Sequence, residues 1–267
     1  MADYDETIKT HYKTVADQEG LLPTSTMADL RTRQLETELI LRCLKEIVLA
    51  EQKPSKIADV GCGNGYTLEV LYRQYPQFAY TGLEYSQDLR LLAKQRFSSF
   101  PKIKVLPIDI RDKSSYPKES FDFILCQRVL INLLNRKDQD HAFNNIIDAV
   151  KKGGVILFIE AFDSGLRELN EARAELGQGP IPPAYHNLYL EDDFFISNSR
   201  VKKVDHDACK ENFLSTHYFV TRVFHPYVWG DKEFKRNSHF VRFFSEALAP
   251  NVGNFSPLRC VVLKRVQ

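Results

Sequence analysis

The sequence predicts an α/β protein with a mainly parallel β-sheet that helices cover on both faces. Short apolar runs alternate with amphipathic segments from about residue 55 to residue 160, which is the pattern of repeated strand–helix units. A glycine-rich turn joins the first apolar run to its helix. We expect one domain over residues 1–267, because no repeat, low-complexity tract or linker divides the chain.

The strands and helices of the first two thirds are expected in alternation. Apolar runs predict strands at residues 56–60, 79–83, 103–106, 121–126 and 155–159. Apolar residues at helical spacing predict helices at residues 30–50, 66–74, 86–97 and 136–151. Ser86 is expected to cap the third of these helices. The run Lys151-Lys152-Gly153-Gly154 is expected to end the fourth.

The C-terminal third is expected to complete the sheet. Residues 212–224 and 258–266 are rich in β-branched and aromatic residues, which favour strands. Residues 231–248 between them have helical spacing, and their phenylalanines predict a packed apolar face.

One long segment, residues 162–201, does not fit the alternation. It contains the Pro/Gly-rich stretch 177–183 and follows the carboxyl end of the fifth strand. Long loops at such positions often carry function, so we expect an insertion that covers a site.

The bulk composition limits the classes of partner. Net charge is +1, from 36 basic and 35 acidic residues, which gives no electrostatic reason to expect DNA or a membrane surface. The five cysteines are scattered without a CxxC pair, so neither a disulfide framework nor a zinc site is expected. The N-terminus has no features of a signal peptide, and no apolar run reaches the roughly 18 residues that span a bilayer. We expect a cytoplasmic protein.

A ligand site is predicted by the run from Asp59 to Gly65, which reads acid-x-Gly-x-Gly-x-Gly, and by Glu84 at the end of the next strand. Glycines let the backbone approach a ligand, and a carboxylate can accept hydrogen bonds from ribose hydroxyls. A dinucleotide fingerprint requires a glycine at the sixth position from Gly61, where Tyr66 stands. The pattern therefore indicates a nucleoside site of another type.

This run resembles motif I of class I S-adenosylmethionine-dependent methyltransferases, and residues 107–110, 127–132 and 151–154 resemble later segments of that family in order. The resemblance implies a Rossmann-like seven-stranded sheet of order 3-2-1-4-5-7-6 and S-adenosyl-L-methionine as cofactor. It implies contacts of Asp109 with the adenine amino group and of residues 127–132 with the methionine moiety. The cofactor-binding residues are then Asp59, Gly61, Cys62, Gly63, Gly65, Glu84, Tyr85, Asp109, Ile110, Gln127, Arg128, Tyr12 and Arg33.

Tyr12 and Arg33 enter this set because residues 1–30 and the helix after them resemble the N-terminal lid of small-molecule and sugar methyltransferases. A guanidinium can pair with the cofactor's carboxylate in bidentate fashion. Arg31 could serve instead of Arg33, and either could lie on a solvated helix face.

The resemblance implies O-methylation of a small molecule or glycan, such as a bacterial surface sugar, with a general base to remove the acceptor proton. The candidate bases are His186, Glu160 and His217, with His225 as a further possibility. Glu160 could instead cap a neighbouring segment, His217 could be a packed strand residue, and His225 could shape a turn before Pro226. No metal site is expected. Substrate contacts are expected from Tyr185, Asn187, Tyr189 and Arg222.

Two other functions stay open. A nicotinamide-dependent oxidoreductase is disfavoured by Tyr66 and by the lack of a Tyr-x-x-x-Lys dyad. A non-catalytic nucleoside-binding or interaction module would be expected to show a degraded glycine turn or no ribose acid. Among methyltransferases, a protein or tRNA acceptor is also open, although Gln127-Arg128-Val129-Leu130 stands where many amino-group methylators carry Asn/Asp-Pro-Pro-aromatic.

Overall fold

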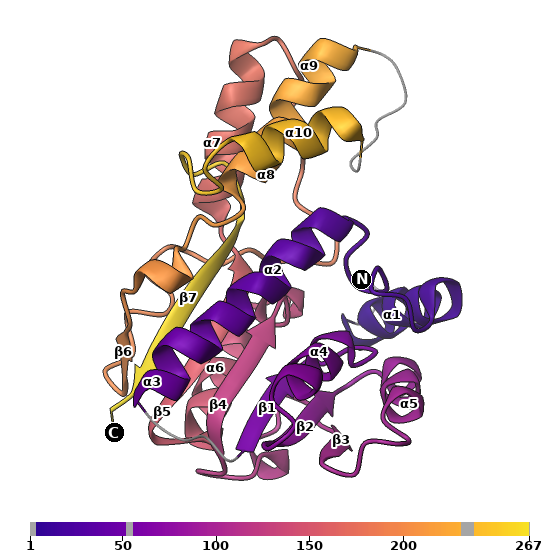
Figure 1. Cartoon of the computed structure of the whole chain (residues 1–267), viewed down its shortest axis with the longest axis vertical. Coiled ribbons are helices and arrows are strands. Elements are labelled where there is room, and N and C mark those ends of the chain that lie inside the picture. The colour runs from indigo at the N-terminus through magenta and orange to yellow at the C-terminus, as the bar shows by residue number, and fades with distance from the viewer. Residues whose placement is uncertain (1–3, 52–55, 231–237, 267) are drawn as a thin grey trace.

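The computed structural model describes residues 4–51, 56–230 and 238–266 of the chain. Its centre is a seven-stranded sheet of order β3-β2-β1-β4-β5-β7-β6, which confirms the predicted fold (Figure 1). The first five strands are parallel, and β7 runs antiparallel to both of its neighbours. The strands are β1 (Lys56–Val60), β2 (Ala79–Glu84), β3 (Ile103–Pro107), β4 (Phe121–Gln127), β5 (Val150–Ala161), β6 (Val201–Lys203) and β7 (Leu258–Arg265).

Helices surround the sheet, and the central strands are almost wholly apolar because both of their faces are covered. The longer helices before the insertion are α1 (Tyr4–Glu19), α2 (Leu30–Cys43), α4 (Tyr66–Gln74), α5 (Gln87–Arg96) and α6 (Arg136–Ala149). A π-helical turn (Leu44–Val48) extends α2 into the short α3 (Leu49–Glu51). Ser86 caps α5 as expected, since its side chain accepts a hydrogen bond from the Leu89 N–H.

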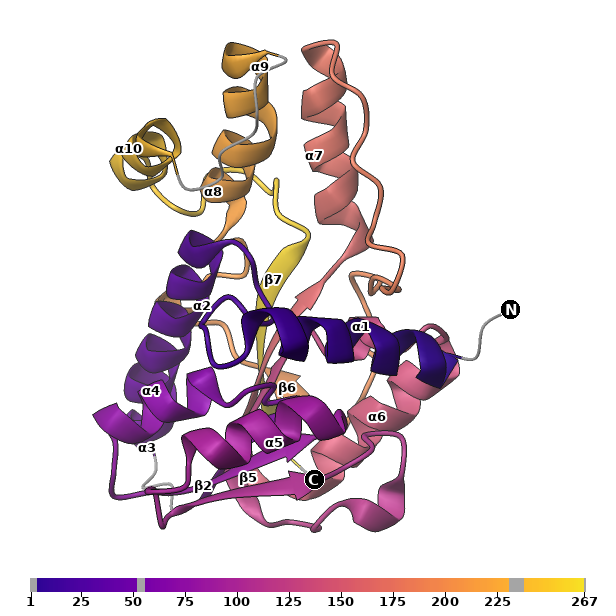
Figure 2. The ribbon, with the colours of Figure 1, turned by 90° about the vertical axis from the view of Figure 1, so that its right-hand side faces the viewer.

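A separate group of helices stands beyond the carboxyl ends of the parallel strands, above α1 in the view of Figure 2. It consists of α7 (Asp163–Glu175), α8 (Ser215–Phe219), α9 (His225–Trp229) and α10 (His239–Ala247). A π-helical turn (Val220–Phe224) joins α8 to α9. The helix expected at residues 231–248 is confirmed by α10, while residues 231–237 lie outside the described part of the chain.

The strand expected at residues 212–224 is wrong, because α8 and the π-helical turn occupy this run. Most of this run is buried, and the buried side chains include polar ones: Ser215, Thr216, His217 and Thr221. Packing against the neighbouring helices therefore outweighs the β-propensity of the valines, threonines and aromatics. The sixth strand is instead β6, which is too short and polar to be recognised in the sequence.

Two boundaries also differ from expectation. The helix before the fifth strand ends at Ala149, and Lys151-Lys152-Gly153-Gly154 belongs to β5, with Gly153 at a φ of 76°. The segment 162–201 is not loop throughout, because α7 fills its first third. Within the described residues, no helix is both long enough and apolar enough to cross a bilayer.

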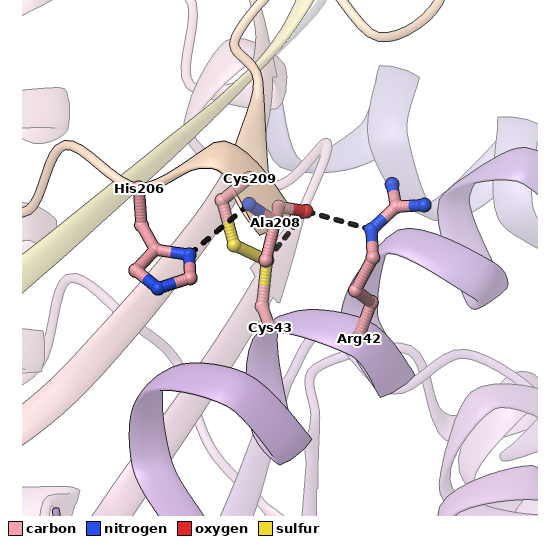
Figure 3. The surroundings of a disulfide bond; sticks show 5 residues. All are labelled: Arg42, Cys43, His206, Ala208 and Cys209. Carbon is pink, nitrogen blue, oxygen red and sulfur yellow. Dashed lines mark hydrogen bonds between the residues drawn. A yellow bond between two sulfur atoms is a disulfide. The ribbon is translucent and has the colours of Figure 1, made fainter. Parts of the chain in front are cut away.

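A disulfide joins Cys43, at the end of α2, to Cys209, which precedes α8 (Figure 3). The two Cα atoms are 5.9 Å apart, and the Arg42 side chain donates a hydrogen bond to the Ala208 carbonyl beside them. The sequence predicted no disulfide framework, because the five cysteines are scattered without a CxxC pair. Spacing alone cannot pair two cysteines that are 166 residues apart. Closing a loop of this length lowers the entropy of the unfolded chain by an amount equivalent to about 5 kcal/mol.

Candidate active site

The glycine turn lines a hollow, which we call the cofactor pocket, with an empty volume of about 960 Å³ that includes its open mouth. The turn lies where β1 ends, and Gly61, Gly63 and Gly65 all have positive φ. A Cβ added to Gly61 would lie 2.3 Å from Val129 Cγ2, so this position requires glycine for space as well as for conformation. Backbone and ligand can therefore approach closely at the carboxyl edge of the sheet, which is where parallel α/β folds bind their ligands.

Glu84 lies at the end of β2 and faces the same pocket. One carboxylate oxygen accepts a hydrogen bond from the Gly63 N–H (2.8 Å), and the other accepts from the Ser86 N–H (2.7 Å). These bonds fix the carboxylate and leave each oxygen a further lone pair for a ligand donor. Burial raises the pKa of Glu84, against the pull of the two backbone donors. The geometry suits a side chain that accepts hydrogen bonds from a pair of hydroxyls.

Asp59 is the buried acid at the end of β1. Burial, reinforced by the nearby charge of Glu84, raises its pKa to about 8, while Arg33 and Arg128 only partly offset this effect. The carboxyl group is therefore largely protonated at neutral pH. A ligand cation placed beside it would favour the ionised form.

We expect cofactor binding to release a proton through Asp59, because a pKa of about 8 leaves roughly 0.9 proton bound at pH 7. Calorimetric titration with S-adenosylhomocysteine at pH 7, in buffers of different ionisation enthalpy, measures this release. The Asp59→Asn variant is expected to bind S-adenosylhomocysteine with the same heat in every buffer. A wild-type heat that is identical in all buffers would contradict the assignment.

Tyr85, Asp109 and Ile110, of which the resemblance places Asp109 at the adenine, also line this pocket. Asp109 is already engaged, because Arg111 donates to both of its oxygens (Nε 2.9 Å, Nη2 2.6 Å). Burial opposes ionisation of Asp109, but the hydrogen bonds and charge of Arg111 lower its pKa. Arg111 also lies 5.7 Å from the Tyr85 ring, and its role was not foreseen from the sequence.

Gln127 gives a direct test of whether the pocket fits a ligand. Its Oε1 accepts a hydrogen bond from Thr67 (3.1 Å), whereas its Nε2 is buried without a partner. Buried donors are almost always satisfied in native proteins, so this amide is poised for a ligand acceptor. Together with the glycine turn, Asp59 and Glu84, it fits a nucleoside that carries an amino acid group.

The N-terminal segment that resembles a lid contributes Tyr12, Thr26 and, from the helix after it, Arg33 to the wall of this pocket. Tyr12 of α1 accepts a hydrogen bond from Asn132 (2.6 Å), and Arg33 donates to the Pro23 carbonyl and to Thr26. Burial lowers the pKa of Arg33 to about 10, so its guanidinium stays charged at neutral pH. Arg33 lines the pocket and Arg31 does not, which favours Arg33 over Arg31 as the carboxylate partner.

Two further side chains tie the lid to the glycine turn. Asn64 donates to the carbonyls of Gly20 and Leu22 (both 2.9 Å), and Arg96 donates to the carbonyls of Asn64 and Leu21. The lid position is thus coupled directly to the turn that approaches the cofactor.

Arg128 is held in an unusual backbone conformation, with a φ of 53°, and pairs with the buried Glu36 of α2. Such a conformation is uncommon outside glycine and is often found at functional sites. Sequence reasoning missed Glu36, whose place beside Arg128 depends on how α2 crosses the sheet.

A second cavity, the inner hollow, adjoins the cofactor pocket and shares with it Tyr12, Thr26, Arg128 and Asn132. Among its other lining residues are Ser25, His186 and Asn187. A third cavity, the outer hollow, shares His11, Val15 and Gln18 with the inner hollow and is bounded by Tyr185. The structure therefore brings Tyr185, His186 and Asn187 close to the cofactor pocket.

The other two candidate bases lie elsewhere. Glu160 is fully buried, and its oxygens accept hydrogen bonds from the backbone N–H groups of residues 129, 130 and 131. Burial raises its pKa to about 7, which these donors only partly offset. His217 is buried in α8 rather than in a strand, and it contacts Asp29 (3.0 Å) and Ser245 (3.1 Å). Neither residue lines the cofactor pocket or the inner hollow, so we assign both to the framework of the protein.

Three remaining candidates are also outside these cavities. Arg222 lies over the Tyr218 ring at 3.6 Å, which is a packing contact within the helix group. Tyr189 packs against the core, and burial raises its pKa to about 12. His225 stacks on Trp229 in α9. Within the described residues, no three His, Cys, Asp or Glu side chains converge as a metal site.

The sheet order, the glycine turn and the acid at the end of β2 are those that the class I S-adenosylmethionine-dependent methyltransferase resemblance implied, with S-adenosyl-L-methionine as the cofactor. Residues 57–154 match the methyltransferase domain family.

Known proteins agree with this class. Malonyl-[acyl-carrier protein] O-methyltransferase of Paenibacillus sp. (strain JDR-2) is 26% identical over 160 residues, which cover 58% of this chain and 57% of that protein. The chain thus matches little more than half the length of this curated relative. Two solved structures share the fold at low sequence identity. A putative sarcosine dimethylglycine methyltransferase from Galdieria sulphuraria gives a TM-score of 0.53 at 14% identity, over 89% of this chain and 86% of the other. N-methyltransferase NodS from Bradyrhizobium japonicum WM9 gives a TM-score of 0.52 at 17% identity, over 87% of this chain and 93% of the other.

Proposed function

We propose that this protein transfers the methyl group of S-adenosyl-L-methionine to a hydroxyl oxygen of a small polar acceptor that binds in the inner hollow. The observation that carries the proposal is the junction of two cavities at Tyr12, Thr26, Arg128 and Asn132. A methyl transfer is an in-line displacement, so donor and acceptor must meet at one opening with little intervening protein. The O-methyltransferase name of the bacterial relative supports oxygen as the acceptor atom.

Each part of the cofactor pocket has a role in this proposal. Glu84 would accept hydrogen bonds from the ribose hydroxyls, and Tyr85 and Ile110 would enclose the adenine. Asp59 and Arg33 would hold the ammonium and carboxylate of the methionine end. When bound, the cofactor supplies an electrophilic methyl group. The protein orients the two reactants and excludes water with the lid of α1 and residues 20–27.

His186 is the general base in this proposal. Its Nδ1 is buried without a partner, and the residue lines the inner hollow. Burial, and secondarily the neighbouring His11, lowers its pKa to about 4, so the ring is uncharged at neutral pH and can accept a proton.

The test is calorimetric titration of the protein with S-adenosylhomocysteine, and with NADH in parallel. We expect micromolar binding of S-adenosylhomocysteine and no heat from NADH. Binding of NADH alone would show that Glu84 binds the ribose of a nicotinamide cofactor, as in an oxidoreductase, and would refute the proposal.

Turnover is tested with methyl-labelled cofactor and a panel of hydroxylated acceptors. His186→Ala is expected to lower the rate at least tenfold with unchanged cofactor affinity. Full activity of this variant would exclude His186 as the base. His206→Ala is the control, because His206 lies beside the disulfide (Figure 3) and lines none of the three cavities.

A further inference from the structure

We infer that the acceptor is a neutral, polyhydroxylated molecule of at least two units, such as a disaccharide, with its reacting unit in the inner hollow and its second unit in the outer hollow. This inference rests on the proposed function and adds to it the charge, chemistry and length of the acceptor.

The length follows from the order of the cavities along α1. Tyr12 lies between the cofactor pocket and the inner hollow, whereas His11, Val15 and Gln18 lie between the inner and outer hollows. The three spaces thus adjoin in series along one helix. An acceptor whose reacting group meets the cofactor can extend past His11 into the outer hollow.

The chemistry follows from polar atoms that the protein leaves unsatisfied. Ser25 Oγ, His186 Nδ1 and Asn187 Oδ1 are buried without hydrogen-bond partners, and all three residues line the inner hollow. Ser25 is only 4% exposed. Three such atoms around one cavity are expected to be satisfied by a ligand that can both donate and accept hydrogen bonds. Neighbouring hydroxyl groups on one ring meet this requirement.

The charge follows from the ionic groups of the same cavity. Its arginine, Arg128, is paired with Glu36, and the carboxylate of Glu19 accepts a hydrogen bond from Thr24 (2.6 Å). The charge of Arg128 is therefore balanced within the protein, whereas Glu19 keeps its charge because its partner is a neutral hydroxyl. The unsatisfied atoms of this cavity are the hydroxyl, imidazole and amide already described, and with Arg128 paired they favour a neutral acceptor over an anion.

The aromatic rings between the two hollows supply a surface for the second unit. His11 stacks on His186 at 4.1 Å between ring centroids, and Tyr185 donates or accepts a hydrogen bond at His11 Nδ1 (3.3 Å). Tyr185 is 74% exposed, a high value for so large an aromatic side chain. Sugar rings present apolar C–H faces that pack on such rings, so Tyr185 is placed to contact the second unit and not the first.

The experiment is saturation-transfer NMR on the protein saturated with S-adenosylhomocysteine. The probes are methyl glycosides of common hexoses and 6-deoxyhexoses, the disaccharides built from them, succinate as an anion and ethanolamine as a cation. We expect at least one disaccharide to bind about fivefold or more tightly than its own single unit. Asn187→Ala and Ser25→Ala are expected to weaken the binding of the disaccharide and of the single unit alike. Tyr185→Ala should remove only the higher affinity of the disaccharide.

The control is Tyr227→Ala, which removes an exposed tyrosine of α9 that lines none of the three cavities and should change nothing. Binding of succinate or ethanolamine in preference to every sugar, or binding of no sugar at all, would overturn the inference on chemistry. An unchanged disaccharide advantage in Tyr185→Ala would overturn the outer site. Failure of S-adenosylhomocysteine itself to bind would instead refute the proposed function, so the two failures are distinguishable.

Discussion

Replacement of Glu84 by alanine is expected to lower the affinity for S-adenosylhomocysteine about a hundredfold. The carboxylate is held by the Gly63 and Ser86 N–H groups and faces the cofactor pocket. Hydrogen bonds to a charged group contribute roughly 1.5–3 kcal/mol each, and loss of about 3 kcal/mol corresponds to a factor of about a hundred. The loss includes the disorder of the glycine turn, because the Gly63 N–H would have no side-chain acceptor.

Calorimetric titration of the variant measures this change, and its melting temperature separates lost binding from lost folding. Glu46→Ala is the matched control, since Glu46 is an exposed glutamate of the π-helical turn after α2. An affinity of Glu84→Ala within threefold of the wild type would show that Glu84 does not bind the ribose.

The second large effect is on stability, at Asp29. Asp29 caps α2 by accepting hydrogen bonds from the Arg31 and Thr32 N–H groups, and it also contacts the buried His217 of α8. Asp29→Ala is expected to lower the free energy of unfolding by about 3 kcal/mol, the sum of roughly 1 for a lost cap and 1–3 for a buried group left unpaired. Urea denaturation at pH 7 measures the loss.

The comparison variant is Ser238→Ala, because Ser238 caps α10 through the Val241 N–H without a buried histidine as partner. Its expected loss is about 1 kcal/mol. Equal losses in the two variants would show that the contact with His217 contributes nothing to stability.

The effect of Asp29 should also depend on pH. Burial alone would raise its pKa, but the hydrogen bond and charge of His217 outweigh burial and lower the pKa to about 2 from 3.8. A lowered pKa means that the contribution to stability is complete above the unfolded value and is lost as the pH falls through the folded value. The difference between wild type and Asp29→Ala should therefore persist at pH 5 and narrow toward pH 2.

The first two thirds of the fold could be predicted because local sequence and tertiary environment agree there. The apolar runs that become β1, β4 and β5 are buried on both faces, and the acid at the end of β2 follows directly from its strand. The helix group beyond the sheet could not be predicted from propensity, since residues 214–225 bury serine, threonine and histidine side chains against other helices. Because nearly every position of this run is buried, and several of the buried residues are polar, its sequence lacks the alternation of apolar and polar residues that marks an amphipathic helix.

The gathering of Asp59, Glu84, Asp109 and Gln127 in one pocket was largely predictable, because the motif and the strand ends place them at one edge of the sheet. Residues that act through tertiary contacts could not be predicted. Glu36 pairs with Arg128 across 92 positions, and Asn132 meets Tyr12 across 120. No local pattern encodes such partners. Glu160 and His217 were predicted as bases for the same reason, because the sequence shows that they can titrate but does not show their tertiary partners. We assign both to the framework.

The shared wall between the cofactor pocket and the inner hollow has a thermodynamic consequence. Tyr12, Thr26, Arg128 and Asn132 belong to both cavities, and Arg33 of the cofactor pocket donates directly to Thr26. A cofactor that orders these side chains prepares part of the acceptor site before the acceptor arrives. The two ligands should then bind with positive cooperativity, and linkage requires that each increase the affinity of the other by the same factor.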